Sequence, residues 1–334
     1  MKDFDNDIIV LYGPTWDQPA QLSKHQFAKI WAKNRKVLYI ESPPNPFSFL
    51  TRTTEAIKLW KRFQKGPQKV SENLWITTFF YLLPYRGSKL FFGGKWVNLL
   101  NQFLLKNRLK KIIRELDLND PIFFVGDAHA FPLIKSYINL FKIYHCSDDY
   151  TLVPSYPASY PDLEIQFMKT CDLVITTADE LKVAKEMYNK NTFSIPNGAN
   201  VEHFAKTQSE KVKIAKKINN FNGPVIGYVG TIFQWIDQEW IRFAAGKLAN
   251  YDFIFIGPIT VDVTKIENLR NVHFFGPVDY SLLPKYIKRF DVAIIPFTID
   301  GVTLKASPIK FYEYLASGIP IVSTKLPDLE KFEN

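Results

Sequence analysis

Two oppositely charged side chains, Lys310 and Glu313, lie three residues apart in a segment with the signals of a helix start. Ser307 is a favourable N-cap residue and Pro308 suits the first helical position, which places Ile309 in the first turn. The unpaired N–H groups and positive dipole end of a helix favour anions, so a diphosphate bound there would lie near Lys310. Glu313 would then be placed to accept hydrogen bonds from both hydroxyls of a ribose. The alternative is an ordinary capped helix with Lys310 and Glu313 as a surface ion pair.

A second group of polar residues follows strand-like segments in the N-terminal half. Asp148 and Asp149 come directly after one such segment, where they are suited to orienting an acceptor hydroxyl or removing its proton; helix capping or solvation is the alternative. Gly13 ends the first strand-like segment and permits close approach of the backbone to a ligand, or forms a simple turn. His145 and Cys146, with Asp148, have metal-binding side chains. Residues so close in sequence rarely converge on one ion, so we expect no metal site.

The composition is that of a globular protein large enough for two domains. The chain has 334 residues, of which 46% are hydrophobic and 22% are charged, and a domain usually contains about 100–200 residues. Its first residues lack the basic-then-apolar order of a signal peptide. The longest uncharged stretch, residues 218–236, has nineteen residues but contains three asparagines and Pro224, so it does not supply the ~20 predominantly apolar residues that span a bilayer. The two cysteines, Cys146 and Cys171, are too few for a disulfide framework, which favours a reducing cytoplasm.

The elements that must position these residues alternate between strand and helix. This order predicts an α/β fold with doubly wound parallel sheets, in which ligands bind beyond the carboxyl ends of the strands. The alternation stops in the polar residues 206–222 and then restarts, so we predict two domains, 1–205 and 206–334, that face an interdomain cleft. Strands are expected at residues 8–12, 37–40, 75–79, 122–125, 143–146, 173–176, 193–195, 225–229, 253–256, 272–275, 292–295 and 319–322, and helices at 22–33, 89–116, 163–170, 178–187, 240–248, 282–288 and 309–316.

Positive charge is concentrated in residues 58–114. The whole chain has a net charge of +9, yet this stretch contains thirteen lysines and arginines and a single acid, Glu72. Tryptophan, tyrosine and phenylalanine residues are interleaved with the cations. Such a mixture suits an anionic membrane surface, because aromatic rings settle at headgroup depth and cations bind the headgroups. Nucleic acid is the rival partner, and a solvated basic face over an aromatic core is the plain alternative.

Four segments occur in a recognisable order along residues 190–330. They are residues 194–204 (SIPNGANVEHF), residues 227–230 (GYVG), residues 271–276 (NVHFFG) together with residues 290–297 (FDVAIIPF), and residues 308–322 (PIKFYEYLASGIPIV). In this order they resemble the hinge segment, the first strand and turn, the later strands and the donor-binding helix of retaining family 4 glycosyltransferases of the GT-B fold. In the N-terminal half, residues 143–150 (IYHCSDDY) and residues 171–177 (CDLVITT) resemble a bacterial polysaccharide-assembly subgroup.

The resemblance implies two Rossmann-like domains, with residues 1–205 binding the acceptor and residues 206–334 binding a nucleotide-sugar donor. His129 aligns with a family histidine near the transferred sugar; a loop histidine with a backbone partner is the alternative. The candidate catalytic residues are then His129, Asp148 and Asp149. The candidate donor-binding residues are Gly13, Gly230, Thr231, Lys305, Ser307, Pro308, Ile309, Lys310 and Glu313.

The sequence departs from the family pattern at the phosphate and sugar contacts. Family members commonly carry two glutamates separated by seven residues; Glu313 fits the second, but Lys305 stands at the first. Thr231 stands where an arginine is usual, and the lysine expected shortly afterwards is missing from residues 232–237. We therefore expect Lys305 and Lys310 to balance the phosphate charge. The family also continues beyond the position of the last residue here, so we expect a truncated C-terminal end.

The function implied by the resemblance is transfer of a sugar from a nucleotide-diphosphate sugar to a saccharide or lipid-linked saccharide acceptor in cell-surface polysaccharide synthesis. It implies retention at the anomeric carbon, with no essential metal ion and no cofactor beyond the donor substrate. We expect a cytoplasmic enzyme that contacts the inner face of the plasma membrane and binds no nucleic acid. Two alternatives share the fold: a sugar-nucleotide epimerase, and a catalytically silent nucleotide-sugar-binding scaffold in which the arginine, the lysine and the first glutamate were lost.

Overall fold

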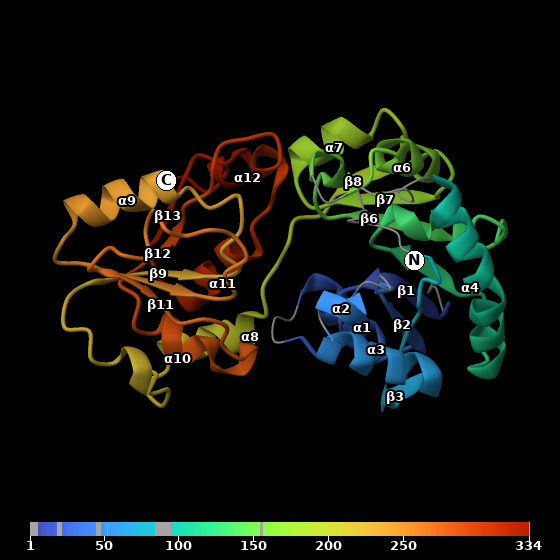
Figure 1. Cartoon of the computed structure of the whole chain (residues 1–334), viewed down its shortest axis with the longest axis horizontal. Coiled ribbons are helices and arrows are strands. Elements are labelled where there is room, and N and C mark those ends of the chain that lie inside the picture. The colour runs from blue at the N-terminus through green and yellow to red at the C-terminus, as the bar shows by residue number, and fades with distance from the viewer. Residues whose placement is uncertain are drawn as a thin grey trace. The chain divides into compact units, whose positions relative to one another are not determined.

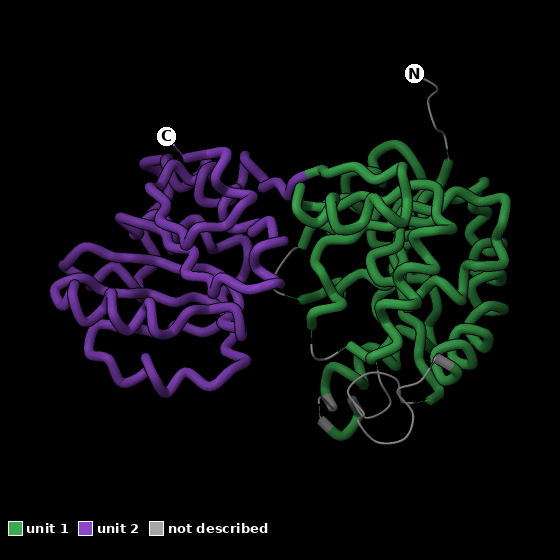
Figure 2. Tube along the Cα trace, turned by 90° about the horizontal axis from the view of Figure 1, so that it is seen from above, with its two compact units in different colours: residues 1–195 green, residues 196–334 purple. Residues whose placement is uncertain are grey.

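The computed structural model describes residues 6–18, 22–44, 48–51, 53–83, 95–153 and 156–333. The chain divides into two compact units, Met1–Ile195 and Pro196–Asn334, which are coloured separately in Figure 2. Each unit contains one predominantly parallel sheet with its own hydrophobic core. The predicted α/β class with two doubly wound sheets is therefore confirmed.

In the described part of the first unit, eight strands form one sheet in the order β3-β4-β2-β1-β5-β6-β7-β8. All neighbouring strands are parallel except β3 and β4, which are antiparallel. The strands are β1 (Ile8–Gly13), β2 (Val37–Glu41), β3 (Gln68–Ser71), β4 (Leu74–Thr78), β5 (Ile122–Val125), β6 (Lys142–Cys146), β7 (Leu173–Thr176) and β8 (Thr192–Ser194). The chain order reverses between β1 and β5, and this reversal is the switch point at which doubly wound sheets bind ligands.

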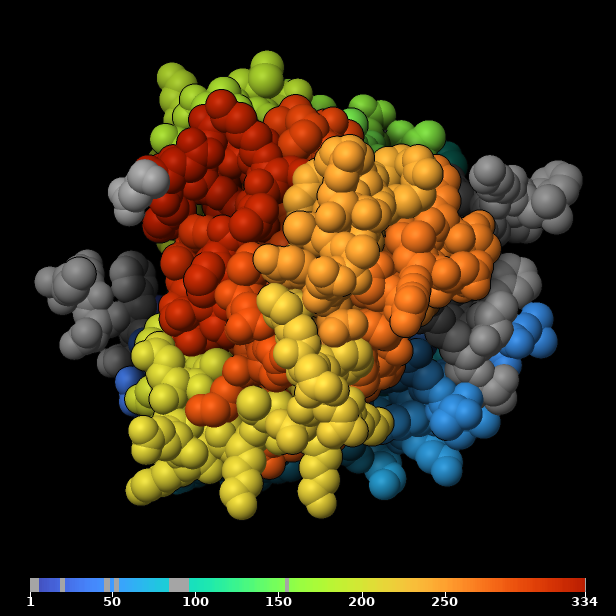
Figure 3. Space-filling view, turned by 90° about the vertical axis from the view of Figure 1, so that its left-hand side faces the viewer, coloured from blue at the N-terminus to red at the C-terminus, as the bar shows by residue number. Residues whose placement is uncertain are grey.

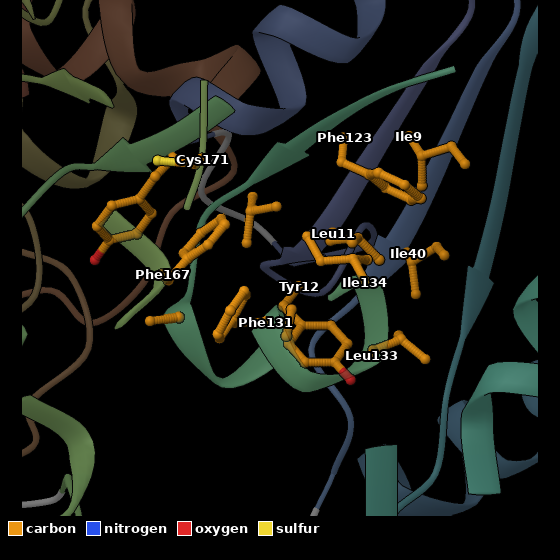
Figure 4. Packing of buried hydrophobic residues seen from close by; sticks show 14 of the residues in the cluster. Ile9, Leu11, Tyr12, Ile40, Phe123, Phe131, Leu133, Ile134, Phe167 and Cys171 are labelled. Atoms are coloured by element: carbon orange, nitrogen blue, oxygen red, sulfur yellow. The ribbon is translucent and has the colours of Figure 1, made fainter. Parts of the chain in front are cut away.

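Helices cover both faces of this sheet. They are α1 (Ser23–Trp31), α2 (Ser48–Thr51), α3 (Thr53–Lys65), α4 (Lys95–Glu115), α5 (Phe131–Ile134), α6 (Tyr160–Met168) and α7 (Asp179–Lys185), with short 3-10 helices η1 (Ala128–Ala130) and η2 (Tyr150–Leu152). Because side chains alternate along a strand, Ile9 and Leu11 pack in the cluster that includes Phe131 of α5, as Figure 4 shows, whereas Ile8 packs with Ala28 of α1. Both faces of β1 are therefore buried.

The second unit has five described strands in the order β11-β10-β9-β12-β13, all parallel to their neighbours. The strands are β9 (Val225–Val229), β10 (Asp252–Ile256), β11 (Val272–Phe274), β12 (Val292–Ile295) and β13 (Ile321–Ser323). The helices are α8 (Val201–Phe204), α9 (Gln238–Lys247), α10 (Leu283–Ile287), α11 (Ile309–Ser317) and α12 (Pro327–Glu330), with 3-10 helices η3 (Ala205–Gln208), η4 (Lys216–Ile218), η5 (Tyr280–Leu282) and η6 (Thr303–Lys305). In Figure 1, α9 lies on one side of this sheet and α8 and α10 on the other. Here the switch point lies between β9 and β12.

The division between the units falls ten residues before the predicted boundary at 205/206. The reason is that residues 196–205 pack on the second unit: the side-chain amide of Asn197 donates to the carbonyl of Ser307 over 2.7 Å, and Phe204 is buried in the core of that unit. The polar residues 206–222 belong to the same unit and lie on its surface, where Figure 3 shows them in yellow.

Most predicted elements are present, with ends shifted by one to three residues. Helix α3 and the antiparallel strand β3 were not predicted, and neither were the four-residue helices α2, α5, α8 and α12. The predicted helix 89–116 is observed from Lys95 to Glu115, and its first six residues lie outside the described part of the chain. Within the described residues, no helix has the length and apolar character needed to span a bilayer.

Candidate functional site

Helix α11 begins beside the carboxyl end of β9, in the second unit. Its first helical residue is Ile309. The N-cap position is occupied by Pro308, whereas the sequence analysis predicted Ser307 there. The reason is that the Ser307 side chain is buried, with its hydroxyl 3.4 Å from the hydroxyl of Tyr312. The backbone N–H of Val229, the last residue of β9, donates to the Tyr314 hydroxyl over 2.8 Å, which ties the helix to the strand.

Lys310 lies over two aromatic rings at this helix start. Its ammonium nitrogen is 4.7 Å from the centroid of the Phe297 ring and 5.2 Å from that of the Tyr228 ring. These distances are typical of cation–π contacts. The stem of Lys310 also passes close to Gly230, because a β-carbon at Gly230 would lie 3.1 Å from Lys310 Cε. Tyr228 and Phe297, which the sequence analysis did not single out, thus position the predicted phosphate-binding cation.

Two glycines bring the carboxyl ends of β9 and β10 together. Gly230 has φ +146° and Gly257 has φ +149°, conformations that side chains rarely adopt. A β-carbon on Gly257 would lie 2.0 Å from the carbonyl oxygen of Gly230. The carbonyl of Thr231, the next residue, accepts a hydrogen bond from the Tyr228 hydroxyl over 3.1 Å. The turn after β9 therefore has a fixed shape that only glycine permits.

Glu313 lies one helical turn after the start of α11 and is half-buried. Burial raises the pKa of its carboxyl to about 7, and the positive charge of Lys310 acts in the opposite direction. Lys305 is the last residue of η6 and is half-buried. Lys305, Ser307, Pro308, Ile309, Lys310 and Glu313 therefore occupy one continuous segment leading into and along α11, as the sequence analysis predicted.

In the first unit, His129 lies in the loop after β5. Its Nδ1 is 2.7 Å from Oδ1 of Asp127, which also accepts the backbone N–H of His129. The imidazole ring is stacked on Tyr156 and contacts Tyr160. The carbonyl of His129 accepts the side-chain amide of Gln102 over 2.9 Å. The loop is thus held rigidly, and Asp127 fixes the orientation of the imidazole.

The neighbouring aspartates after β6 have different surroundings. Asp149 is buried, accepts the Thr151 hydroxyl over 2.5 Å, and lies 3.4 Å from the ammonium of Lys185. Burial raises the pKa of Asp148 to about 6, against the opposing effect of the nearby Lys24. Asp148 is half-buried and accepts a long hydrogen bond of 3.5 Å from the Tyr150 hydroxyl, so it is more accessible to a ligand than the buried, ion-paired Asp149.

Gly13 and the alternative metal ligands also have structural surroundings. A β-carbon on Gly13 would lie 2.2 Å from the Tyr39 hydroxyl, so the glycine makes room for that ring. The His145 ring packs against Phe27 and Phe124, and burial lowers the pKa of its imidazole to about 3. Among the described residues, no three histidine, cysteine, aspartate or glutamate side chains are grouped so that they could hold a metal ion.

The sequence analysis did not single out Lys24, which is one of several buried cations among the described residues. It lies in the first turn of α1 and its side chain extends across Gly126, the residue after β5. A lysine near the start of an amphipathic helix is typical of a solvated position, so no sequence signal distinguished it.

Residues 223–333, most of the second unit, match the family model described as glycosyl transferases group 1. The matched residues form a domain similar to group 1 glycosyltransferases. This domain contains α11, Gly230 and the other predicted donor-binding residues except Gly13.

Solved structures with the same arrangement of elements include glycosyltransferase-type enzymes of the GT-B fold. Sucrose-phosphate synthase from Thermosynechococcus elongatus is 14% identical with a TM-score of 0.64, over 98% of this chain and 83% of that one. Anabaena HepE, solved in complex with UDP and glucose, is 13% identical with a TM-score of 0.65, over 98% of this chain and 83% of that one. These similarities establish the GT-B fold class.

A Bacillus subtilis (strain 168) protein that carries the name teichuronic acid biosynthesis glycosyltransferase TuaH is 27% identical over 222 residues. The match covers 61% of this chain and 55% of that protein, so the chain matches about half the length of this relative.

Proposed function

We propose that this protein is a glycosyltransferase that moves a sugar from a nucleotide-diphosphate sugar to a saccharide acceptor. The observation that carries the proposal is the start of α11 within the group 1 domain, where Lys310 lies over Tyr228 and Phe297 and passes close to the glycine turn at Gly230. A helix start, a positioned ammonium and an adjacent glycine turn form a binding place for a diphosphate. Glu313, on the same helix, is the proposed partner of the ribose hydroxyls.

The chemical step requires stabilisation of a departing diphosphate. The N–H groups at the start of α11 and the ammonium of Lys310 supply positive charge where the negative charge develops. Lys305, at the end of η6, is the proposed second cation in place of the arginine and lysine that the family usually has. We assign to this reaction retention at the anomeric carbon and no requirement for a metal ion, as the family resemblance implies.

The acceptor side of the proposal rests on the first unit. TuaH is named for teichuronic acid synthesis, and we propose that this protein likewise extends a cell-surface polysaccharide, with a saccharide or lipid-linked saccharide as acceptor. HepE has been solved with UDP-glucose, so UDP-glucose is the first donor to test. The proposed location is the cytoplasm, at the inner face of the plasma membrane.

Donor binding and turnover are measured separately. Isothermal titration calorimetry with UDP, uridine and a panel of nucleotide sugars is expected to show binding that needs the diphosphate. Incubation with the bound donor and an acceptor panel should release the nucleoside diphosphate, and NMR of the product should show the donor's anomeric configuration even with a chelator present. Conversion of the donor without acceptor would instead identify an epimerase. Binding without any turnover would identify a scaffold.

Contact with an anionic membrane is a second part of the proposal. The fold helps to decide which part of residues 58–114 makes this contact. Arg62 of α3 is buried in ion pairs with Glu41 and Asp17, so it stabilises the fold and does not belong to the predicted cationic surface. The ring of Trp60 is stacked on Phe63 at 5.4 Å. Trp60 is nevertheless 38% exposed, so Arg62 and the half-buried Phe63 are what support the plain alternative for the α3 part of the stretch.

Helix α4 differs from α3, because near its start polar side chains face the interior and apolar side chains face outward. Asn98, Asn101 and Gln102 are buried, and Gln102 accepts the Tyr12 hydroxyl over 2.7 Å. On the opposite side, Trp96 and Phe103 are 81% and 69% exposed, with Leu100 and Leu104 beside them. The spacing of 4, 3 and 1 residues places these four side chains in one stripe along the helix.

The exposed side of α4 continues from this apolar stripe into Lys110, Lys111 and Arg114, which are all exposed. Apolar side chains enter the acyl boundary of a bilayer, and each cation near an anionic surface contributes about 1 kcal/mol. The order of an apolar stripe followed by a cationic one fits a bilayer that contains anionic lipid. We therefore assign the membrane contact to α4.

Vesicle flotation tests this assignment. The protein should bind phosphatidylcholine vesicles that contain phosphatidylglycerol, bind weakly to phosphatidylcholine alone, and be released by salt. The double variant Trp96→Ser/Phe103→Ser and the double variant Lys110→Glu/Lys111→Glu should each lose this binding. The matched controls are Phe243→Ser, at an exposed phenylalanine of α9, and Lys216→Glu/Lys217→Glu, at exposed lysines of the second unit. Equal losses in the controls, or an α4-dependent dimer without lipid binding, would contradict the assignment.

A further inference from the structure

Lys24 lies at the switch point of the sheet in the first unit. The sheet order runs from β1 to β2 on one side and from β5 to β8 on the other, so the loops after β1 and β5 diverge there. Lys24 is on α1, which follows β1, and its side chain extends across Gly126, which follows β5. A β-carbon at Gly126 would lie 2.0 Å from Lys24 Cε and 2.8 Å from Nζ. The glycine therefore leaves the space that the lysine fills.

Lys24 is a buried residue whose ammonium has no direct partner. The residue is 7% exposed, and among the described residues its Nζ has neither a hydrogen bond nor an ion pair. Lys185 is the instructive contrast, because it is 5% exposed but lies 2.9 Å from Glu164 and 3.4 Å from Asp149. An unpaired buried charge is unfavourable for folding, so such a group is characteristic of a binding site. Burial lowers the pKa of Lys24 accordingly.

Two carboxylates act on Lys24 from beyond ion-pair distance. Asp148 and Asp127 both favour its charged form electrostatically. Asp127 is engaged with the Nδ1 of His129, whereas Asp148 accepts a long hydrogen bond of 3.5 Å from the Tyr150 hydroxyl. A simple anion would be attracted by Lys24 and repelled by Asp148. A hydroxyl group suits both, because its oxygen accepts a hydrogen bond and its proton donates one.

We propose that Lys24 and Asp148 form a subsite for a saccharide hydroxyl, which accepts a hydrogen bond from the ammonium and donates one to the carboxylate. The subsite binds and orients the sugar at the carboxyl ends of β5 and β6. In the proposed glycosyltransferase, Lys24 and Asp148 are acceptor-binding residues. This inference rests on the proposed function, because that function identifies the bound sugar as the acceptor. Strain nearby is consistent with a ligand site, since Tyr12 at the end of β1 has φ +58°.

The first test compares two buried lysines. Lys24→Met removes the charge and keeps the length of the side chain, so the urea midpoint of unfolding should stay the same or rise. Lys185→Met removes the partner of a buried glutamate and should lower the midpoint strongly. If Lys24→Met lowers the midpoint as much as Lys185→Met does, Lys24 is a structural residue and the proposal is wrong.

The second test asks which ligand covers the ammonium. Lysines are acetylated briefly, and the labelled peptides are quantified by mass spectrometry, with the exposed Lys33 as internal control. A panel of p-nitrophenyl glycosides should slow the labelling of Lys24 by at least about fivefold and leave Lys33 unchanged, whereas inorganic phosphate should protect neither. Protection by phosphate alone would replace the hydroxyl site with an anion site. Labelling of Lys24 that no glycoside slows would overturn the proposal.

The third test separates this inference from the proposed function. Lys24→Met and Asp148→Asn should each raise the KM for the glycoside acceptor by about tenfold or more, while the dissociation constant of the donor nucleotide stays unchanged. Lys24→Arg should restore part of the acceptor affinity. Intact KM values with normal donor binding would refute the subsite alone. Loss of donor binding in the unmodified protein would refute the proposed function instead.

Discussion

The ammonium nitrogen of Lys310 lies 4.7 Å from the ring centroid of Phe297, a residue thirteen positions earlier in the chain. Tyr228 contributes a second ring at 5.2 Å. Because the negative faces of the two rings attract the ammonium, Lys310 is held at the start of α11 before any phosphate binds. This pre-positioning reduces the side-chain entropy that a lysine loses when it binds a ligand.

Phe297→Leu should weaken UDP binding by about two- to thirtyfold, the range that corresponds to a cation–π contact of about 0.5–2 kcal/mol. The variant removes one of the two aromatic rings that hold Lys310 but leaves the positive charge of Lys310 in place. Calorimetry with UDP measures the effect. Phe253→Leu is the control, since Phe253 is buried in the same core on β10. It should reduce stability and spare UDP affinity; an equal loss of affinity would indicate a general packing effect.

Lys310→Met should reduce affinity for UDP much more than affinity for uridine, because a cation acts on the phosphate charge. A charged hydrogen bond contributes about 1.5–3 kcal/mol, or roughly ten- to a hundredfold in affinity. Lys305→Met should give a smaller loss of the same kind if Lys305 is the second cation. Equal losses for UDP and uridine in Lys310→Met would rule out the phosphate role.

Glu313→Gln should remove a pH dependence of donor binding. The pKa of the wild-type carboxyl is raised to about 7 by burial, so the carboxylate that accepts the ribose hydroxyls is lost as the pH falls below that value. UDP-glucose is the suitable probe, because a terminal phosphate would titrate in the same range. Wild-type affinity should fall from pH 8 to pH 6, whereas Glu313→Gln should bind weakly at both.

The raised pKa of Glu313 also predicts that the stability of the unliganded protein depends on pH. A carboxyl whose pKa is higher in the folded state than its ordinary value near 4.5 keeps its proton more tightly when folded. Its contribution to stability is therefore fully present below the ordinary value and is lost as the pH rises toward 7. Urea unfolding of the unliganded wild type should show this decline, and Glu313→Gln should not show it.

Gly257→Ala should destabilise the second unit by more than about 2 kcal/mol and weaken UDP binding, because its φ is +149° and the new β-carbon would lie 2.0 Å from the carbonyl oxygen of Gly230. Gly246→Ala on α9 is the control. A β-carbon there has no atom within 4 Å, and alanine favours a helix by about 1 kcal/mol relative to glycine. Comparable destabilisation by both variants would contradict this explanation.

Much of the secondary structure follows from local patterns. The apolar segments that contain β1, β5, β9 and β12 are buried on both faces, as parallel strands usually are, and the sequence placed each of them to within one residue. The antiparallel strand β3 was missed because three of its four residues are exposed and their pattern resembles a loop. Ser307 was expected to cap α11 because the residue type favours that role, but its side chain is buried against Tyr312 instead.

The sequence by itself determined the α/β class, the segment that forms α11, and the order of motifs by which the second unit is related to group 1 glycosyltransferases. These features depend on spacing within short stretches, where one or two turns of helix fix which side chains share a face. Only the tertiary structure decided that Lys310 rests on Phe297, that Lys24 is buried without a partner, and that the apolar side of α4 near Trp96 faces outward. The physical reason is that burial and charge pairing depend on which distant segments meet, and residue type and local periodicity carry no information about those contacts.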